Sequence, residues 1–225
     1  MTVSSSVSDS SADSSLSGTP LGRPVGADGE QTRRRIITAA MRCVAEVGYS
    51  QTTIREIARA ADMTSGSLYH YFSNKSELLR ATGQEIENIV LPRLRGAVAS
   101  SDNVADQLDA VLDESKRLMR DFPHLAAFLR AVRSGGVTQS RLSAPQYPGS
   151  KALRDVVTEI VENAHSQGAL SPATDTTAAI DAICALTRGL TEPAALDSPE
   201  VYDATLSVAK RMVRGTLFTR PKAGR

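Results

Sequence analysis

Two short helical segments separated by a tight turn constrain the fold of this chain more than any other feature. Thr53 and Glu56 form a capping box, in which the Thr53 side chain can accept from the Glu56 amide while the Glu56 side chain reaches back to the Thr53 amide. The apolar pattern that follows stops at Asp62-Met63-Thr64. Thr64 or Ser65 can then cap a second helix over residues 66–72. This spacing predicts a helix-turn-helix.

The second helix of this pair has an inward and an outward side. Leu68 and Phe72 lie four residues apart, so they are predicted to face the core together. The outward side chains are then polar or aromatic: Ser67, Tyr69, His70 and Tyr71.

Longer helices are predicted on both sides of the motif. One runs from Gln31 with apolar residues at three- and four-residue steps, and Gly48 is a natural stop after it. Another begins after Asn74, with Glu77 three residues later, and runs toward residue 95. Pro92 interrupts this second helix, so it either kinks there or ends near residue 90 and restarts.

The stretch from Gln31 to Leu79 resembles the DNA-binding domain of TetR-family transcriptional regulators. The resemblance rests on Thr-Thr-Ile-Arg-Glu-Ile-Ala at 52–58, on the run from Met63 to Phe72 with its Leu-Tyr-His-Tyr-Phe, and on Lys-Ser-Glu-Leu-Leu at 75–79. The turn departs from the family pattern, because Asp62-Met63 replaces a glycine and a small aliphatic residue; aspartate tolerates the left-handed conformation better than most residues. Ser65 replaces a basic residue or proline, which leaves the base preference open.

The resemblance implies that the second short helix enters the DNA major groove. Small or polar residues at its start would let the backbone approach the bases, and helix N-termini with nearby cations would hold phosphates. The residues predicted to contact DNA are Arg33, Arg34, Thr53, Thr64, Ser65, Gly66, Ser67, Tyr69, His70, Tyr71 and Lys75.

The charge distribution gives this prediction modest support. The whole chain has 26 basic and 25 acidic residues, whereas residues 30–80 have eight basic and five acidic ones. A solvated helix face would explain such an excess as well as a phosphate-binding one. Two alternatives therefore remain open: an ordinary amphipathic surface, and a helical adaptor whose N-terminal domain binds a protein partner.

Beyond residue 80 the pattern is helical throughout, without the alternation typical of strands. We therefore expect an all-α chain, with an N-terminal helix-turn-helix of three short helices followed by a helical ligand-binding and dimerisation bundle, about nine helices in total. The expected organisation is a disordered Ser-rich tail and linker over 1–29, the DNA-binding domain over 30–80, the ligand-binding and dimerisation domain over 81–219, and a flexible tail over 220–225.

The last two predicted helices have dense apolar stripes with small residues beside large ones. Such stripes suit a four-helix interface between two copies, although they equally suit the core of one copy. The resemblance implies dimerisation, and a dimer would read two half-sites of a near-palindromic operator. The predicted interface residues are Ala179, Ala182, Leu186, Tyr202, Leu206, Ala209, Met212, Val213 and Leu217.

The resemblance also implies a small-molecule effector that binds among the helices of the bundle and releases the operator. Met and Phe among Ala and Leu predict an apolar pocket and therefore an apolar or amphipathic effector. The predicted wall residues are Leu118, Met119, Phe122, His124, Phe128, Leu129, Tyr147, Ile183 and Arg188, although ordinary core or surface is the simpler interpretation of each one.

Several classes of function lack their sequence signals. The chain has no G-x-S-x-G, P-loop, dinucleotide-binding or H-E-x-x-H motif, and no Cys/His cluster at ligand spacing, so we expect neither an enzyme nor a metal or cofactor site. No apolar run is long enough to span a membrane. Cys43 and Cys184 are well separated in the sequence, which suits buried thiols in a reducing compartment and predicts a cytoplasmic protein.

Overall fold

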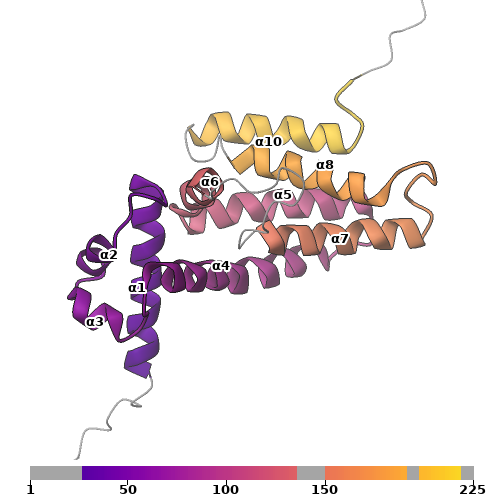
Figure 1. Cartoon of the computed structure of the whole chain (residues 1–225). Helices are drawn as coiled ribbons and strands as arrows, with labels where there is room; N and C mark the ends of the chain where they lie inside the picture. The colour runs from indigo at the N-terminus through magenta and orange to yellow at the C-terminus, as the bar shows by residue number, and fades with distance from the viewer. Residues whose placement is uncertain (1–26, 136–149, 192–197, 219–225) are drawn as a thin grey trace, which may run out of the picture.

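The computed structural model describes residues 27–135, 150–191 and 198–218, and within these ranges every regular element is a helix. Figure 1 shows α1 to α3 at one end of the molecule, with α4 running from that end into a bundle formed with α5, α7, α8 and α10. The prediction of an all-α fold is therefore confirmed. The helices are α1 (Ala27–Val47), α2 (Ile54–Ala60), α3 (Ser65–Tyr69), α4 (Lys75–Val98), α5 (Val104–Asp121), α6 (Leu125–Gly135), α7 (Ser150–Ser166), α8 (Thr176–Thr191) and α10 (Pro199–Val213).

The first helix is longer than the sequence predicts. α1 begins at Ala27, so the last residues of the predicted linker, which extends to Gly29, are helical. Asp28 and Glu30 lie in its first turn, where negative charge is stabilised by the helix dipole. The helix ends before Gly48, whose φ of 88° is the left-handed conformation expected of a glycine stop. The predicted tails over residues 1–26 and 220–225 lie outside the described residues.

The turn between α2 and α3 forms as predicted. The Glu56 amide donates to Thr53 Oγ1 at 3.2 Å, and the Thr53 amide donates to Glu56 Oε2 at 2.9 Å, which completes the capping box of α2. Asp62 adopts the left-handed conformation with a φ of 54°. The prediction for α3 is wrong at its end, because regular helix stops at Tyr69 rather than Phe72.

The long helix α4 passes through its proline without ending. Asn74 caps it, since the Glu77 amide donates to Asn74 Oδ1 at 2.9 Å. Pro92 lies inside the helix, so the alternative of an end near residue 90 is wrong. The carbonyl that loses its helical partner belongs to the exposed Asn88, where water can replace the missing donor.

One apolar core joins the two ends of the molecule. The buried cluster extends from Ile36 of α1 through Leu94 of α4 to Cys184 of α8. α1 packs against α4 and also against α6, so two helices of the bundle contact the N-terminal end directly. A second, smaller cluster connects α5, α8 and α10: Leu112, Leu190, Tyr202, Leu206 and Ala209.

Ion pairs fix the face of α10 and the turn after it toward α5. Arg214 bonds Asp106 at 2.6 Å and Asp109 at 2.7 Å. Lys210 bonds Asp113 at 2.5 Å. The opposite face of α10 is consequently turned away from the rest of the chain.

Candidate nucleic-acid interface and ligand cavity

α3, the shortest helix, exposes Tyr69 to solvent, while buried apolar side chains anchor the helix in the core. Leu68 is fully buried and Phe72 is 2% exposed, as the sequence predicts, whereas the neighbouring Tyr69 is 53% exposed. The Ser67 amide donates to Thr64 Oγ1 at 3.1 Å, which caps α3 at its N-terminus. The apolar anchors and this cap hold α3 at the surface in one orientation, so its outward residues are preorganised for contact with a partner.

Gly66 has no structural reason to be glycine. Its φ is not positive, and a Cβ built on it would meet only Thr64 Oγ1 at 3.8 Å, an ordinary contact distance. Glycine inside a helix is less stable than alanine by roughly 0.5–1 kcal/mol. The chain therefore has a destabilising residue on the exposed start of α3, where the absence of a side chain lets another molecule approach the backbone.

The remaining predicted residues of α3 differ in exposure. Thr64 and His70 are exposed, whereas Ser65 and Ser67 are half-buried. Tyr71 is half-buried and packs against the apolar core, so its prediction as an outward residue is only partly met. It lies beyond the regular helix, because α3 ends at Tyr69.

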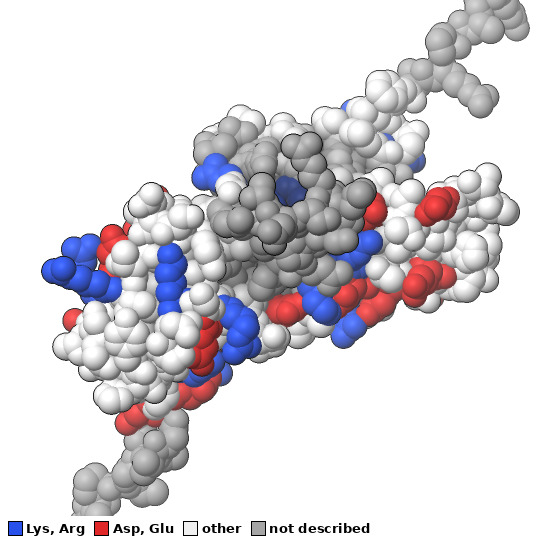
Figure 2. All heavy atoms as spheres, in the orientation of Figure 1, with Lys and Arg blue, Asp and Glu red and all other residues white. Residues whose placement is uncertain are grey.

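Two of the predicted cations, Arg33 and Lys75, already have contacts within the protein. The Arg33 guanidinium lies 5.0 Å from the centre of the Phe72 ring. Lys75 Nζ donates to the Ser50 carbonyl at 3.2 Å and lies 5.3 Å from the centre of the Tyr49 ring. These contacts hold one positive charge at Phe72, just after α3, and the other at the turn that follows α1. Figure 2 shows basic side chains at this end of the molecule, next to a largely uncharged surface.

Two predicted phosphate contacts have anionic partners within the chain. Arg34 Nε lies 3.4 Å from Glu30 Oε1, in an exposed pair. The Thr53 hydroxyl donates to Glu56 Oε2 at 2.8 Å, and these bonds from Thr53 lower the pKa of the Glu56 carboxyl. A phosphate at Thr53 would have to displace this carboxylate, which makes Thr53 a weaker candidate than the cations near α3.

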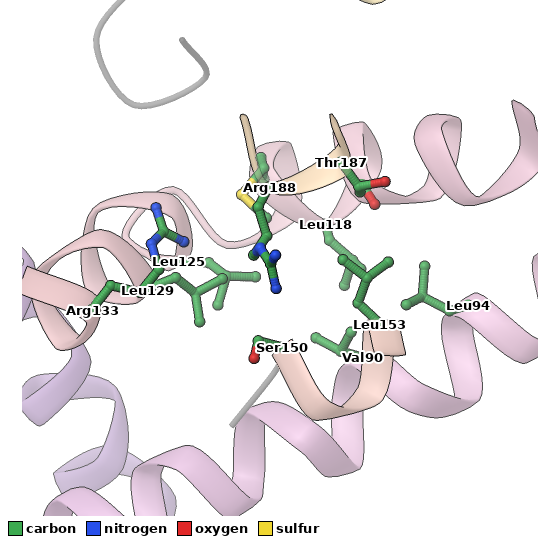
Figure 3. Close-up of a pocket in the computed structure, with 12 residues that line it drawn as sticks. Val90, Leu94, Leu118, Leu125, Leu129, Arg133, Ser150, Leu153, Thr187 and Arg188 are labelled. Atoms are coloured by element: carbon green, nitrogen blue, oxygen red, sulfur yellow. The ribbon is translucent and has the colours of Figure 1, made fainter. Parts of the chain in front are cut away.

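The bundle contains a cavity between α4, α5, α6, α7 and α8. Its volume is about 50 Å³, and it is partly open to solvent. Figure 3 shows Arg188 reaching from α8 into the middle of the cavity toward Ser150, with leucine side chains on either side. The lining residues are Val90, Leu94, Ser115, Leu118, Met119, Leu125, Leu129, Arg133, Ser150, Leu153, Thr187 and Arg188.

The predicted wall residues divide into two groups. Four of them line the cavity: Leu118, Met119, Leu129 and Arg188. The others that the structure describes lie away from this cavity: Phe128 is buried in the core, Phe122 and Ile183 pack against the core, and His124 borders a separate hollow beside α1. Tyr147 lies outside the described residues.

Both cysteines are buried free thiols, as the sequence predicts. Burial raises the pKa of Cys43 and Cys184, so both stay protonated near neutral pH. Over the described ranges, no group of three or more His, Cys, Asp and Glu side chains is arranged to hold a metal ion. In the same ranges no helix has the length and apolar character needed to cross a bilayer.

Comparison with known proteins identifies the N-terminal end of the chain. Residues 36–82, which contain α2, α3 and their supports, match the family model of bacterial regulatory proteins of the tetR family. The chain is 36% identical over 85 residues to the HTH-type transcriptional regulator BetI of Escherichia coli, a match covering 36% of this chain and 43% of that protein. The segment from residue 36 to 82 is therefore of the tetR-family type. The chain spans less than half the length of this curated relative.

Solved structures extend the likeness over the bundle. A regulatory protein of the tetR family from Rhodococcus RHA1 covers 81% of this chain and 97% of its own, with 26% identity and a TM-score of 0.61. AibR, solved with isovaleryl coenzyme A and operator DNA, covers 80% of this chain and 97% of its own, with 21% identity and a TM-score of 0.62. At that identity, the likeness to AibR establishes the fold alone.

The bundle buries some of the residues predicted to form the dimer interface and exposes others. Tyr202, Leu206 and Ala209 are buried against Leu112 and Leu190 of the same chain, so little of their surface is left for contact with a second copy. Ala182 and Met212 are exposed, and the other predicted residues are half-buried: Ala179, Leu186, Val213 and Leu217.

The sequence prediction missed most of the exposed stripe of α10 and most of the cavity wall, of which it named four of the twelve lining residues. Val201 and Val208 are 51% and 43% exposed, and they lie on the same face as Met212. Arg133 follows Leu129 by one helical turn on α6, a spacing that would have placed both at one wall. Leu153 of α7 gave no comparable signal, because it reaches the cavity only through tertiary packing.

Proposed function

We propose that the chain is a transcriptional repressor that binds a near-palindromic DNA operator as a homodimer and leaves it when a small effector binds in the bundle cavity. The observation that carries the proposal is the outward face of α3, with Gly66 at its start and Tyr69 exposed above the buried Leu68 and Phe72. This arrangement suits a helix that enters the major groove, because the backbone can come close while Tyr69 reaches a base edge or phosphate.

Some contacts with DNA would fix the position of the protein on the duplex, and others would read the base sequence. Arg33 lies over Phe72, just after α3, and Lys75 begins α4; both would hold phosphates, which fix the register without reading bases. Ser65, Gly66 and Tyr69 would meet the bases. This division agrees with the proposed domain organisation, in which DNA is bound by the segment up to about residue 80, although α4 continues through that boundary into the bundle.

Dimerisation would use the exposed faces of α8 and α10. Small residues on α8, Ala182 and Ala185, are exposed, and α10 exposes Val201, Val208 and Met212. Small residues on one helix beside larger ones on its neighbour allow close packing of four helices, two from each copy. Two recognition helices about 34–36 Å apart, or a multiple of this distance, would then meet successive half-sites.

Release of DNA would follow from the helices shared by the cavity and the DNA-binding end. α4 contributes Val90 and Leu94 to the cavity wall, and α6 contributes Leu125 and Leu129. Both helices also pack against α1. An effector that fits one arrangement of α4 and α6 better than the other would shift α1 and α3, and a coupling of about 1–3 kcal/mol is typical of such linkage.

The apolar wall supports an apolar or amphipathic effector. The solved complex of AibR with isovaleryl coenzyme A and operator DNA shows that this fold can combine both kinds of partner in another protein. We propose no catalytic activity or cofactor for this chain, since its matched relatives are named as regulators. Binding to chromosomal DNA would place the protein in the cytoplasm.

Selection of duplexes from a random pool tests the DNA-binding proposal. The wild-type chain should enrich a near-palindromic duplex and bind it with steep salt dependence, because each phosphate contact contributes about 0.9 to the log–log slope. Tyr69→Ala should weaken this binding, whereas Phe218→Ala, which removes an aromatic ring that is 85% exposed at the far end, should not. An adaptor that binds protein would enrich no duplex sequence, and this result would refute the proposal.

A further inference from the structure

We infer that the cavity ligand carries a hydrogen-bond donor, an ammonium or hydroxyl group on a short apolar tail, and that this donor bonds Glu87 of α4. The inference rests on the proposed function, because it gives the chemical class of the effector at the same cavity. It adds a polar requirement that an apolar wall alone does not imply.

Glu87 has a carboxylate oxygen that the folded chain encloses but does not satisfy. The residue as a whole is half-buried, whereas its Oε1 atom is hidden from solvent, and among the described residues no donor bonds that atom. A buried acceptor without a donor costs free energy, so most buried polar atoms in folded proteins have a partner. The exception at Glu87 therefore indicates a partner from outside the chain.

The unsatisfied carboxylate lies on the side of α4 that lines the cavity. Glu87 precedes Val90 by three residues and Leu94 by seven, so the three side chains share one side of the helix. Val90 and Leu94 both line the cavity. Glu87 thus continues this side of α4 toward the DNA-binding end, at the edge of the apolar wall.

Glu87 is also close to the start of α7, which forms another part of the cavity wall. Lys151 bonds Asp155 at 2.5 Å, and the Asp155 carboxylate, with a smaller contribution from that of Glu87, raises the pKa of Lys151. Glu87 is therefore near Lys151, whose neighbour Ser150 lines the cavity. In Figure 3, Ser150 and Val90 lie along the same edge of the cavity. Helical spacing on α4 and proximity to α7 thus agree in placing Glu87 beside the cavity.

Most of the other polar groups of the cavity already have partners. The hydroxyl groups of Ser115 and Thr187 donate to carbonyls of their own helices, at 2.7 Å and 3.0 Å. The two lining arginines, Arg133 of α6 and Arg188 of α8, also have interactions within the chain. Glu87 Oε1 is consequently the acceptor beside the cavity that a ligand can satisfy.

The cavity beside Glu87 suits a short apolar tail. Its walls are leucine and valine side chains from α4, α5, α6 and α7: Val90, Leu94, Leu118, Leu125, Leu129 and Leu153. The volume of about 50 Å³ is well below the roughly 150 Å³ of an apolar cavity that holds benzene. A short aliphatic chain therefore fits better than a ring system, with its donor beside Glu87.

The position of Glu87 also gives the donor a regulatory role. α4 begins with Lys75, a proposed phosphate contact, and Glu87 lies about three turns later on the same helix. α4 also packs against α1 and α7. A ligand that bonds Glu87 and fills the apolar space would favour one position of α4 relative to α7, so the change would reach the DNA-binding end through α4 itself.

Calorimetric titration with four probes of similar size tests the inference. 1-Hexanol has a hydroxyl donor and hexylamine has an ammonium donor, whereas methyl pentyl ether, an isomer of 1-hexanol, and hexanoate have no donor near neutral pH. Wild-type protein should bind at least one of the two donors about tenfold or more tightly than the ether and hexanoate, because hydrogen bonds to a carboxylate are stronger than those between neutral groups. Whichever donor binds more tightly identifies the head group as ammonium or hydroxyl.

Variants then assign the donor to Glu87. Glu87→Leu should abolish the preference for the donor over methyl pentyl ether, and Glu87→Gln should retain only part of it, because an amide keeps an acceptor oxygen without the charge. Glu85→Gln is the matched control, since Glu85 lies two residues earlier on α4 and therefore on the other side of the helix. This control should keep the wild-type affinity for every probe.

Thermal unfolding without ligand separates a binding role of Glu87 from a structural one. Glu87→Leu should leave the unfolding midpoint unchanged or raise it, because the substitution removes a buried acceptor that has no donor among the described residues. A carboxylate that supported the fold would instead give a lower midpoint in both Glu87→Leu and Glu87→Gln.

Four results would overturn the inference: no binding of any probe, binding of the ether or hexanoate as tight as that of both donors, a wild-type donor preference in Glu87→Leu, or a lowered midpoint in both Glu87 variants. All four are read without DNA. Failure of duplex selection with intact donor binding would instead reject the proposed function, so the two failures are distinguishable.

Discussion

Replacing Gly66 by alanine separates the stability of α3 from its function. The added methyl group meets only Thr64 Oγ1 at 3.8 Å, so the fold accommodates it without rearrangement. Alanine is the better helix former by about 0.5–1 kcal/mol. In a chain of this size 1 kcal/mol corresponds to about 2–4 °C, so Gly66→Ala should raise the unfolding midpoint by about 1–4 °C.

The same methyl group should impair DNA binding. It points from the exposed start of α3, where we propose that the backbone approaches the bases most closely. A greater distance between α3 and the DNA would weaken hydrogen bonds to base edges. Each good pair of such bonds contributes about 1–3 kcal/mol, so affinity for a selected duplex should fall about tenfold or more. Mobility shift at fixed salt measures the affinity, and circular dichroism follows unfolding.

Gly96 of α4 offers a matched control for this substitution. It is an exposed helical glycine, and a Cβ built on it meets nothing within 4 Å. Gly96→Ala should therefore give a similar rise in the unfolding midpoint with no change in duplex affinity. If Gly66→Ala gains the same stability and also retains full affinity, the proposed close approach at Gly66 is wrong.

Four further outcomes follow from residues of α4 and α10. Lys75→Gln should weaken binding to all duplexes about equally and reduce the salt slope by about one, whereas a sequence-dependent loss would mean that Lys75 reads bases. Hydrogen bonds from Ser73 lower the pKa of Glu77 in the folded state. The ionised carboxylate therefore stabilises the fold at pH values above its unfolded pKa, and this stabilisation is lost as the pH falls through the lower folded pKa. The unfolding midpoint of Glu77→Gln should consequently fall less steeply in acid than that of wild type. Val208→Arg should yield monomers by light scattering with the fold retained, and a persisting dimer would move the interface elsewhere. Leu206→Arg should instead unfold the chain, because that side chain is 5% exposed.

Local features of the helix-turn-helix were predictable from the sequence. The capping box of Thr53 and Glu56 depends on residues three apart, and the turn depends on the conformation of Asp62 alone. Leu68 and Phe72 likewise follow from helical spacing within one turn. These features need no knowledge of the rest of the fold, because each is decided by contacts among near neighbours in the chain.

The bundle surfaces were not predictable in the same way. α10 has two adjacent apolar stripes, one with Leu206 and one with Val208, and periodicity does not say which of them meets the same chain. The row of ion pairs to α5, including the bond of Lys210 to Asp113 at 2.5 Å, decides this orientation. The cavity wall likewise joins residues far apart in sequence, such as Val90 and Arg188, so it emerges only from tertiary packing.

The continuous core that joins α1 to the bundle has a consequence for how the protein unfolds. Because Ile36 and Cys184 belong to one buried cluster, loss of packing at either end exposes apolar surface at the other. Calorimetry should therefore record a single cooperative transition, and a fragment cut near residue 80 would lose the partners that cover α1. A mutation that creates a cavity deep in the bundle would therefore lower the amount of folded, DNA-binding protein in the cell, although it changes no residue that contacts DNA.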